Sequence, residues 1–243
     1  MAPLDMQSLT AYIEANIIAF HQKRLEKLST LNLHDVLRRK NPYLFRAKNI
    51  LTAHELVQSI LNAYLSSQEE ALFGNFLEDL AVFVAKEVYG GHKSAAEGID
   101  LEIEKDGTVY IVAIKSGPNW GNSSQIARMR NNFKQATRRL RQNRGITAVV
   151  AVNGCCYGRD NRPDKGDYLK LCGQAFWEFI SGDSNMYVSL IQPLGHRARE
   201  KHADFQREYT RILNRFTREF MDEFCTNDLI DWHKLLRFNS GKS

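Results

Sequence analysis

Residues 99–115 read IDLEIEKDGTVYIVAIK, and they contain two strand-like patterns on either side of a turn signal. Residues 99–104 alternate between apolar and acidic types, and residues 109–115 are rich in β-branched types. Both patterns are typical of strands, and the Asp106-Gly107 pair between them favours a tight two-residue turn. The sequence therefore predicts an antiparallel β-hairpin.

The turn also predicts the register of this hairpin. With Asp106 and Gly107 at its tip, Asp100 lies directly opposite Ala113. Side chains alternate along a strand, so Asp100 and Lys115 share one face, together with Glu102. Directly opposed Cβ atoms lie roughly 4.5–5.5 Å apart. The pattern brings an acid and a lysine together, provided that the register does not slip.

The rest of the chain alternates between helical and strand patterns. Apolar residues at helical spacing, capping residues and Gly-Gly or Asn-Pro breaks predict helices within residues 1–50 and over residues 52–64, 67–89, 123–142, 176–180 and about 205–224. Apolar runs predict strands over residues 146–153 and 187–192, and residues 157–166 are expected to form a loop.

This order of elements predicts the fold class. Helices, a hairpin and further alternating strands and helices indicate an α/β protein with a central mixed sheet. The sequence has no internal repeat and no long linker. We therefore expect a single domain over residues 1–243, with a helical N-terminal portion (1–66), a core (67–195) and a helical C-terminal portion (196–243).

Composition narrows the functional classes. No apolar run reaches the ~18–20 residues of a membrane span, and the N-terminus lacks a secretory pattern, so we expect a cytoplasmic location and no membrane partner. The four cysteines form no CxxC pair, the histidines form no zinc motif, and a phosphate-binding GxxxxGK loop is missing. We expect structural thiols and no nucleotide cofactor.

The hairpin and its flanks resemble a known family. The segments GID (98–100) and AIKSG (113–117) resemble the PD-(D/E)XK nuclease signature, as it occurs in type II restriction endonucleases. Four flanking segments strengthen the resemblance, which covers residues 41–236: NPYLFRAKN (41–49), FGNFLE (73–78), KSGPNWGNSSQ (115–125) and DWHKLL (231–236). The resemblance implies a restriction-endonuclease-like core.

The resemblance also implies an activity and its residues. It implies a type II restriction endonuclease that makes sequence-specific double-strand cuts in DNA with Mg²⁺, as part of a restriction-modification system, and that works as a homodimer. Asp100 corresponds to the shared metal ligand and Lys115 to the catalytic lysine. The backbone carbonyl of Ile114 would be a second metal ligand, and Glu78 matches the accessory acid of many such nucleases.

One position departs from the family pattern. The family has Glu or Asp where this chain has Ala113. Either another acid has taken over the role, with Glu78 and Glu102 as candidates, or the alanine is an engineered knock-out, or the protein only binds DNA. A repair or recombination nuclease of the same fold and a small-molecule hydrolase are further alternatives.

A basic segment follows the hairpin. Residues 123–144 contain seven Lys or Arg and no acid, which favours a polyanion such as DNA as the partner, although a solvated helix face is the alternative. The polar loop before this helix is suited to DNA contacts, or to a turn in which Ser123 caps the helix. The predicted DNA-binding residues are Asn119, Trp120, Asn122, Ser123, Ser124, Gln125, Arg128, Arg130, Lys134, Arg138, Arg159 and Arg162.

Overall fold

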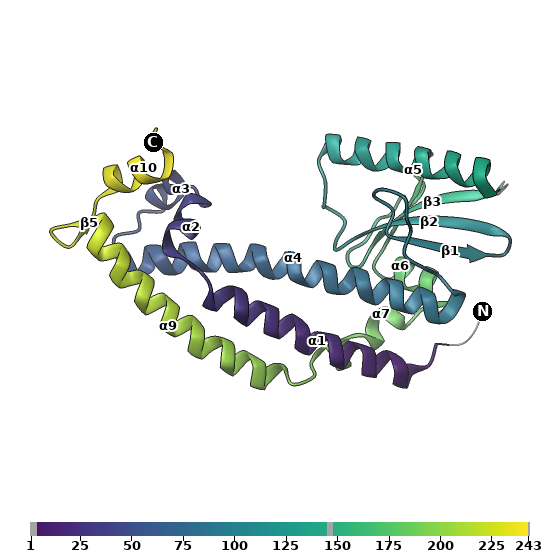
Figure 1. Cartoon of the computed structure of the whole chain (residues 1–243), viewed down its shortest axis with the longest axis horizontal. Coiled ribbons are helices and arrows are strands. Elements are labelled where there is room, and N and C mark those ends of the chain that lie inside the picture. Colours follow the sequence, from purple (N-terminus) through teal and green to yellow (C-terminus); the bar gives the residue numbers. More distant parts are fainter. Residues whose placement is uncertain (1–3, 145–147, 243) are drawn as a thin grey trace. The chain divides into compact units, whose positions relative to one another are not determined.

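The computed structural model describes residues 4–144 and 148–242, which form two compact units (Figure 1). The first unit combines Met1–Ile17 with Phe73–His196, and the second combines Ile18–Leu72 with Arg197–Ser243. Two helices, α1 (Met6–Ser29) and α4 (Ala53–Tyr89), contribute residues to both units. The single domain expected from the sequence stays a prediction.

The first unit is built on a four-stranded sheet with the order β1-β2-β3-β4. Its strands are β1 (Leu101–Lys105), β2 (Thr108–Lys115), β3 (Val149–Cys155) and β4 (Leu169–Cys172). The first pair is antiparallel, and the other two pairs are parallel. The expected α/β fold with a mixed sheet flanked by helices is confirmed.

The hairpin register is the one that the turn predicts. Leu101 pairs with Val112, and Lys105 pairs with Thr108. The turn residues Asp106 and Gly107 have positive φ angles of 51° and 71°, as a two-residue hairpin of this type requires. The N–H of Asp100 donates to the carbonyl of Val112 at 2.8 Å, although Val112 is the partner of Leu101. The regular ladder therefore ends at Leu101, and the direct pairing of Asp100 with Ala113 stays a prediction.

Helices cover both faces of this sheet. Helix α5 (Ser123–Arg144) lies along one face (Figure 1), where its predicted apolar stripe packs on alternate residues of β2. Helix α6 (Gln174–Ser181) packs on the other face, because the Phe176 ring occupies the space that a Cβ on Gly154 would need. The cluster under α5 includes Ile99, Val109, Ile111, Ala113, Met129, Phe133, Ala136 and Leu140.

Helix α4 is longer than the sequence pattern suggests. Thr52 caps its start, accepting the N–H of Glu55 at 3.2 Å, and Gly90 with a φ of 69° ends it, both as predicted. The second helix start predicted at Ser67 is wrong. The Ser67 hydroxyl donates to the carbonyl of Ala63 one turn back, so it lies inside a continuous helix.

The strand predicted over residues 187–192 is also wrong. Helices α7 (Met186–Ser189) and α8 (Ile191–Leu194) occupy this segment. Met186 and Leu190 are buried while Val188 and Ile191 are exposed, which is helical rather than alternating spacing. The fourth strand is β4 instead, a four-residue segment interrupted by Lys170 that gives little strand signal. Of the strand predicted over residues 146–153, residues 146 and 147 lie outside the described part.

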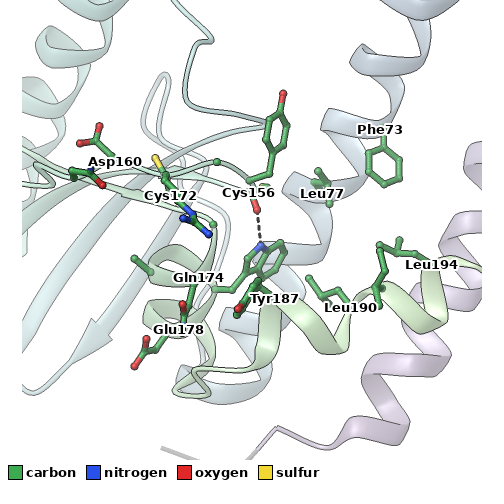
Figure 2. Close-up of a pocket in the computed structure, with 18 residues that line it drawn as sticks. Phe73, Leu77, Cys156, Asp160, Cys172, Gln174, Glu178, Tyr187, Leu190 and Leu194 are labelled. Atoms are coloured by element: carbon green, nitrogen blue, oxygen red, sulfur yellow. Dashed lines mark hydrogen bonds between the residues drawn. The ribbon is translucent and has the colours of Figure 1, made fainter.

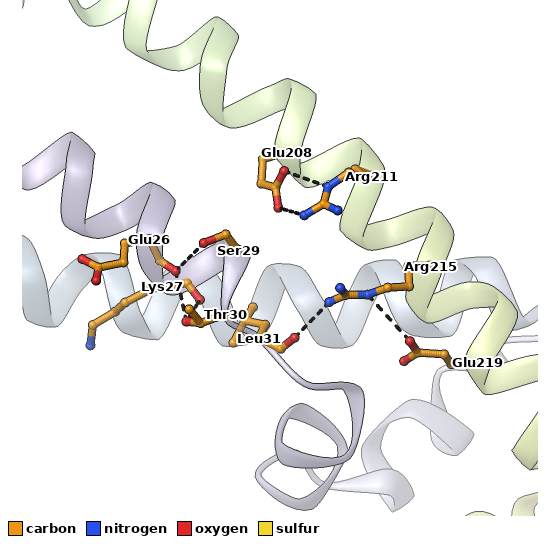
Figure 3. Close-up of polar contacts among 9 residues, drawn as sticks. All are labelled: Glu26, Lys27, Ser29, Thr30, Leu31, Glu208, Arg211, Arg215 and Glu219. Atoms are coloured by element: carbon orange, nitrogen blue, oxygen red, sulfur yellow. Dashed lines mark hydrogen bonds and ion pairs between the residues drawn. The ribbon is translucent and has the colours of Figure 1, made fainter.

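The second unit is helical apart from a short hairpin. Besides parts of α1 and α4 it contains α2 (Leu33–Arg38), α3 (Pro42–Ala47), α9 (Ala198–Phe224), β5 (Cys225–Thr226), β6 (Leu229–Ile230) and α10 (Trp232–Ser240). Arg215 of α9 donates to the carbonyl of Leu31 at 3.0 Å, just beyond the end of α1, and pairs with Glu219 (Figure 3). None of the described helices has the length and apolar character to cross a membrane.

Candidate active site

Asp100 and Lys115 lie together at one end of the hairpin. Lys115 Nζ is 3.8 Å from Asp100 Oδ2. The side chain of Lys115 is 32 % exposed and that of Asp100 is 20 % exposed, so both are reachable from solvent. Asp100 Oδ2 also accepts the N–H of Ile114 at 2.6 Å, which fixes the carboxylate against β2. The acid and the lysine predicted to share a face are therefore neighbours.

The carbonyl of Ile114 faces the same side of β2 as Asp100. Alternate residues of a strand direct their N–H and C=O groups to the same neighbour. The carbonyl of Val112 accepts the N–H of Asp100. Ile114 lies two residues further along β2, so its carbonyl points to the same side. At that level β1, which begins at Leu101, has already ended. No β1 residue continues the ladder there, so this carbonyl is directed to the edge where Asp100 lies.

Glu78 reaches the same edge from α4. Burial raises the pKa of this carboxyl above its usual value, and the nearby negative charge of Asp100 raises it further, while Lys115 opposes the shift. The carboxyl of Glu78 is therefore within electrostatic range of both groups. In the parts of the chain that the structure describes, no three His, Cys, Asp or Glu side chains form a metal-binding group, so any ion here would also need carbonyl or water ligands.

Glu102 is engaged elsewhere. It lies opposite Ile111 and is buried. One of its oxygens accepts the hydroxyl of Ser94 at 2.6 Å, and the other lies 3.7 Å from His92 Nε2. These contacts hold the carboxylate against the segment before β1, and they favour Glu78 over Glu102 as the partner of Asp100.

Ala113 is fully buried, with an exposed fraction of 0 %. It packs in the cluster under α5 with Met129 and Phe133. Its Cα lies beside that of Asn153 on β3. The position that carries an acid in the family pattern is thus part of the hydrophobic core in this chain.

The loop after β2 is held by local hydrogen bonds. Asn122 and Gln125 each accept the backbone N–H of the other at 3.0 Å, so Asn122, not Ser123, caps α5. The short polar side chain of Asn122 comes before the first helical residue, where an N-cap acceptor must lie. Ser123, Ser124 and Asn119 are exposed, whereas Trp120 is half-buried with its ring 5.5 Å from Lys115 Nζ.

The cations of α5 differ in their ion pairs. Arg128 pairs with Glu97 at 2.7 Å and Arg130 with Asp167 at 3.4 Å. Lys134, Arg138 and Arg141 are exposed and have no ion-pair partner within the described residues. Together with Arg130 and Asp167, these three cations line a groove of about 490 Å³ between α5 and β3.

The loop predicted over residues 157–166 lies at a different cavity from the groove beside α5. Arg159 is exposed and lines a cavity of about 860 Å³, with apolar Phe73, Leu77 and Leu194 on one side and polar Gln174 and Glu178 on the other (Figure 2). Arg162 is exposed as well. The loop is anchored by Asp160, which accepts the N–H of Arg162 at 2.9 Å and the ammonium of Lys165 at 3.0 Å.

Sequence reasoning missed Asn153. Its amide is buried beside Ala113 and bonds to Trp120. The sequence contained one signal, an amide residue inside the apolar run of residues 148–153. A buried polar side chain needs hydrogen-bond partners, and here the two shortest bonds, to Ala113 and Trp120, come from segments far away in the chain.

The first unit has a mixed sheet flanked by helices, and an aspartate and a lysine lie together at one end of its hairpin. This arrangement, together with the family match, is that of the PD-(D/E)XK restriction endonuclease superfamily. The chain belongs to the type II restriction endonuclease EcoO109I family, whose model matches residues 7–202. The resemblance inferred from the motifs is confirmed, although the match begins before residue 41 and does not reach residues 231–236. No curated protein matches the chain in sequence. Membership places the protein among DNA-binding nucleases, a class that generally uses divalent metal ions.

Proposed function

We propose that this protein is a type II restriction endonuclease that makes Mg²⁺-dependent, sequence-specific double-strand cuts in DNA by phosphodiester hydrolysis. The observation that carries the proposal is the 3.8 Å contact between Asp100 and Lys115 at an accessible end of the hairpin. If the two groups formed only a solvated ion pair, the contact would contribute under ~1 kcal/mol and have no further role. Family membership favours the catalytic interpretation.

The donor set of the site fits Mg²⁺. Asp100 and Glu78 offer carboxylate oxygens, and Ile114 offers a carbonyl oxygen at the same edge. Hard oxygen donors of this kind, completed by water, are what Mg²⁺ prefers. When bound, the ion would stabilise charge on the scissile phosphate and lower the pKa of an attacking water.

The side chains divide the remaining work. Lys115 Nζ, close to Asp100, is placed to orient the attacking water or to neutralise negative charge that develops at phosphorus. Glu78 supplies the second acid that position 113 lacks, since its charge interacts with both Asp100 and Lys115. Its raised pKa fits a carboxyl that is held close to another carboxylate.

The basic surface of α5 would bind the DNA backbone. Lys134, Arg138 and Arg141 are exposed cations without ion-pair partners in the described part of the chain, as phosphate-binding groups need to be. The remaining predicted contacts, from the loop before α5 and from Arg159 and Arg162, are proposed to support base recognition. Two related active sites are needed to cut both strands of a palindrome, so we propose a homodimer.

Plasmid cleavage tests this function. The protein is incubated with plasmid DNA and Mg²⁺, and the DNA ends are sequenced, with Lys115→Ala as the inactive control. Cutting within one short recurring sequence is expected. Scattered nicks would point to a repair or recombination nuclease, and a DNA affinity that hardly depends on salt would point to a small-molecule hydrolase.

The identity of the second acid is tested by two matched variants. Glu78→Gln should abolish cutting, whereas Glu102→Gln should retain it, because Glu102 is bound to Ser94 and His92. The opposite result would assign the role to Glu102. DNA affinity, measured without divalent ions, should be similar in both variants.

A DNA-binding protein without catalysis is the second candidate, and the alanine at position 113 favours it. It predicts binding without cutting at any concentration of Mg²⁺ or Mn²⁺. Ala113→Glu separates the two explanations of an inactive protein. Restored cutting would identify a disabled enzyme, and continued inactivity in a folded variant would identify a binding protein. The fully buried position makes a loss of stability of about 1–3 kcal/mol the expected side effect.

A further inference from the structure

Asn153 is a buried amide that bonds to Trp120 and Ala113, and its Oδ1 also accepts a longer contact from Cys155 Sγ at 3.9 Å. It lies on β3 with an exposed fraction of 1 %. Its Oδ1 accepts the indole N–H of Trp120 at 3.1 Å, and its Nδ2 donates to the carbonyl of Ala113 at 3.1 Å. Burying an amide costs free energy unless its polar atoms are bonded, and these two bonds tie the loop after β2 to the sheet.

These bonds place Trp120 beside Lys115. Asn153 is the β3 neighbour of Ala113, and side chains two residues apart on β2 share a face. The indole held by Asn153 therefore lies on the face from which Lys115 projects. Lys115 Nζ is 5.5 Å from the centroid of the Trp120 ring and 3.8 Å from Asp100 Oδ2.

A lysine needs such restraint to act at a defined point. Its ammonium is carried on a flexible four-carbon chain, so one ion pair leaves many conformations accessible. An ammonium within about 6 Å of an indole face is attracted by the ring. The ring of Trp120 and the carboxylate of Asp100 together restrict the ammonium to one region.

We propose that Asn153 and Trp120 are positioning residues that hold the ammonium of Lys115 next to Asp100. The proposal rests on the proposed function, because it assigns Lys115 the catalytic role. Asn153 holds the indole of Trp120 by a hydrogen bond, and the indole in turn restricts the position of the Lys115 ammonium. In the competing explanation, Trp120 only fills space against the apolar cluster under α5 and is indifferent to Lys115.

Tryptophan fluorescence tests the contact without DNA or metal. The chain has three tryptophans, so Trp177→Phe with Trp232→Phe leaves Trp120 as the only emitter. In EDTA, Lys115→Met and Asn153→Leu should each change the intensity or wavelength of this emission. Lys105→Met is the matched control, since Lys105 lies at the turn end of β1 over the ring of Tyr89. Emission that does not respond to Lys115→Met would overturn the proposal.

Single-turnover cleavage tests the consequence. Trp120→Phe keeps a ring but loses the N–H. With the protein in saturating excess over the DNA, it should slow cutting about tenfold, since misplacing a catalytic group by about 1 Å can cost up to 10²-fold. Trp177→Phe loses a comparable 2.8 Å bond, to the carbonyl of Cys156, and should leave the rate within about twofold. Equal slowing by both variants would reduce Trp120 to a structural role.

The fluorescence and cleavage experiments distinguish a failure of the proposed function from a failure of the positioning role. If the wild-type protein cuts no DNA, the proposed function fails, while the fluorescence measurement still decides whether Trp120 and Asn153 position Lys115. If the protein cuts DNA and Trp120→Phe cuts as fast as wild type, the function stands and the positioning role is wrong. Because Trp120→Phe leaves Asn153 in place, the test survives a folding defect in Asn153→Leu.

Discussion

Glu78 shows how a single residue depends on its surroundings. On the sequence it is one of two adjacent acids on a helix, Glu78 and Asp79. In the structure, Asp79 pairs with Lys93 at 2.8 Å, while Glu78 lies half-buried within reach of the charges of Asp100 and Lys115. The two adjacent acids therefore have different surroundings, and we propose a role in the site for Glu78 alone.

The raised pKa of Glu78 predicts a pH-dependent stability. The folded protein holds the Glu78 proton more tightly than the unfolded chain, so wild-type stability falls as the pH rises from the ordinary glutamate pKa to the raised one. Glu78→Gln has no ionisable group at this position, so its stability does not fall in this pH range. In metal-free buffer, it should be more stable than wild type at neutral pH, and the difference should vanish near about pH 4.

Urea unfolding across this pH range is the measurement, with Glu104→Gln as the control. Glu104 is an exposed glutamate of the same unit, so its variant makes the same chemical change outside the site. A stability difference for Glu78→Gln that is constant with pH, or that grows toward acid, would contradict the interpretation of this carboxyl.

At the scale of the element, α5 is two-sided. Its apolar stripe is buried against β2, and the opposite side carries exposed cations. The stripe follows from helical periodicity and could be identified from the sequence. The sequence does not show which of the cations form ion pairs. Glu97 and Asp167, the partners of Arg128 and Arg130, come from other segments of the chain.

The unpaired cations of α5 predict a salt dependence. Replacing Lys134 or Arg138 with Ala should weaken DNA binding and reduce the slope of log K against log salt by about 1 for each phosphate that is no longer neutralised. Affinity is measured by anisotropy without Mg²⁺ over a range of salt. Arg211→Ala on α9 removes the same charge from a pair with Glu208, and should leave the slope unchanged. Unchanged slopes in the α5 variants would mean that this groove does not bind phosphates.

Two glycines of the first unit predict opposite effects of the same substitution. A Cβ on Gly74 of α4 would meet Ser116 at 3.6 Å, which is ordinary contact, so Gly74→Ala should stabilise the protein by about 0.5–1 kcal/mol. A Cβ on Gly154 of β3 would lie 2.1 Å from the Phe176 ring, so Gly154→Ala should destabilise it by about 1–3 kcal/mol. Urea midpoints measure both, and a stable Gly154→Ala would show that α6 packs differently.

At the scale of the molecule, each unit is assembled from separate segments. The first unit combines Met1–Ile17 with the sheet and its helices, and Tyr12 stacks on Phe83 of α4 with ring centroids 4.0 Å apart. The first turns of α1, up to Ile17, are therefore part of the first unit, although α2, α3 and α4 lie between α1 and β1 in the chain.

This assembly predicts that the first turns of α1 support the first unit. Ile13 is fully buried, so Ile13→Ala should cost about 2–5 kcal/mol in the free energy of unfolding. Met6→Ala on the same helix removes a side chain that is 43 % exposed, and should cost less than about 1 kcal/mol. Urea denaturation compares the two, and equal stabilities would show that α1 is dispensable for the core.

Features that depend on neighbours along the chain follow from residue order alone. The turn at Asp106-Gly107 decides the hairpin register, and with it the meeting of Asp100 and Lys115. Periodicity decides the buried face of α5. Turn geometry and helical periodicity act over a few residues, so their effects are visible in the order of residues.

The tertiary structure decided what depends on contacts between distant segments. It selected β4 rather than residues 187–192 as the fourth strand, because burial of Met186 and Leu190 favours a helix there. It brought Glu78 rather than Glu102 to the pair, and it joined Asn153 to Trp120. Burial and long-range hydrogen bonds are set by packing, which residue order alone does not specify.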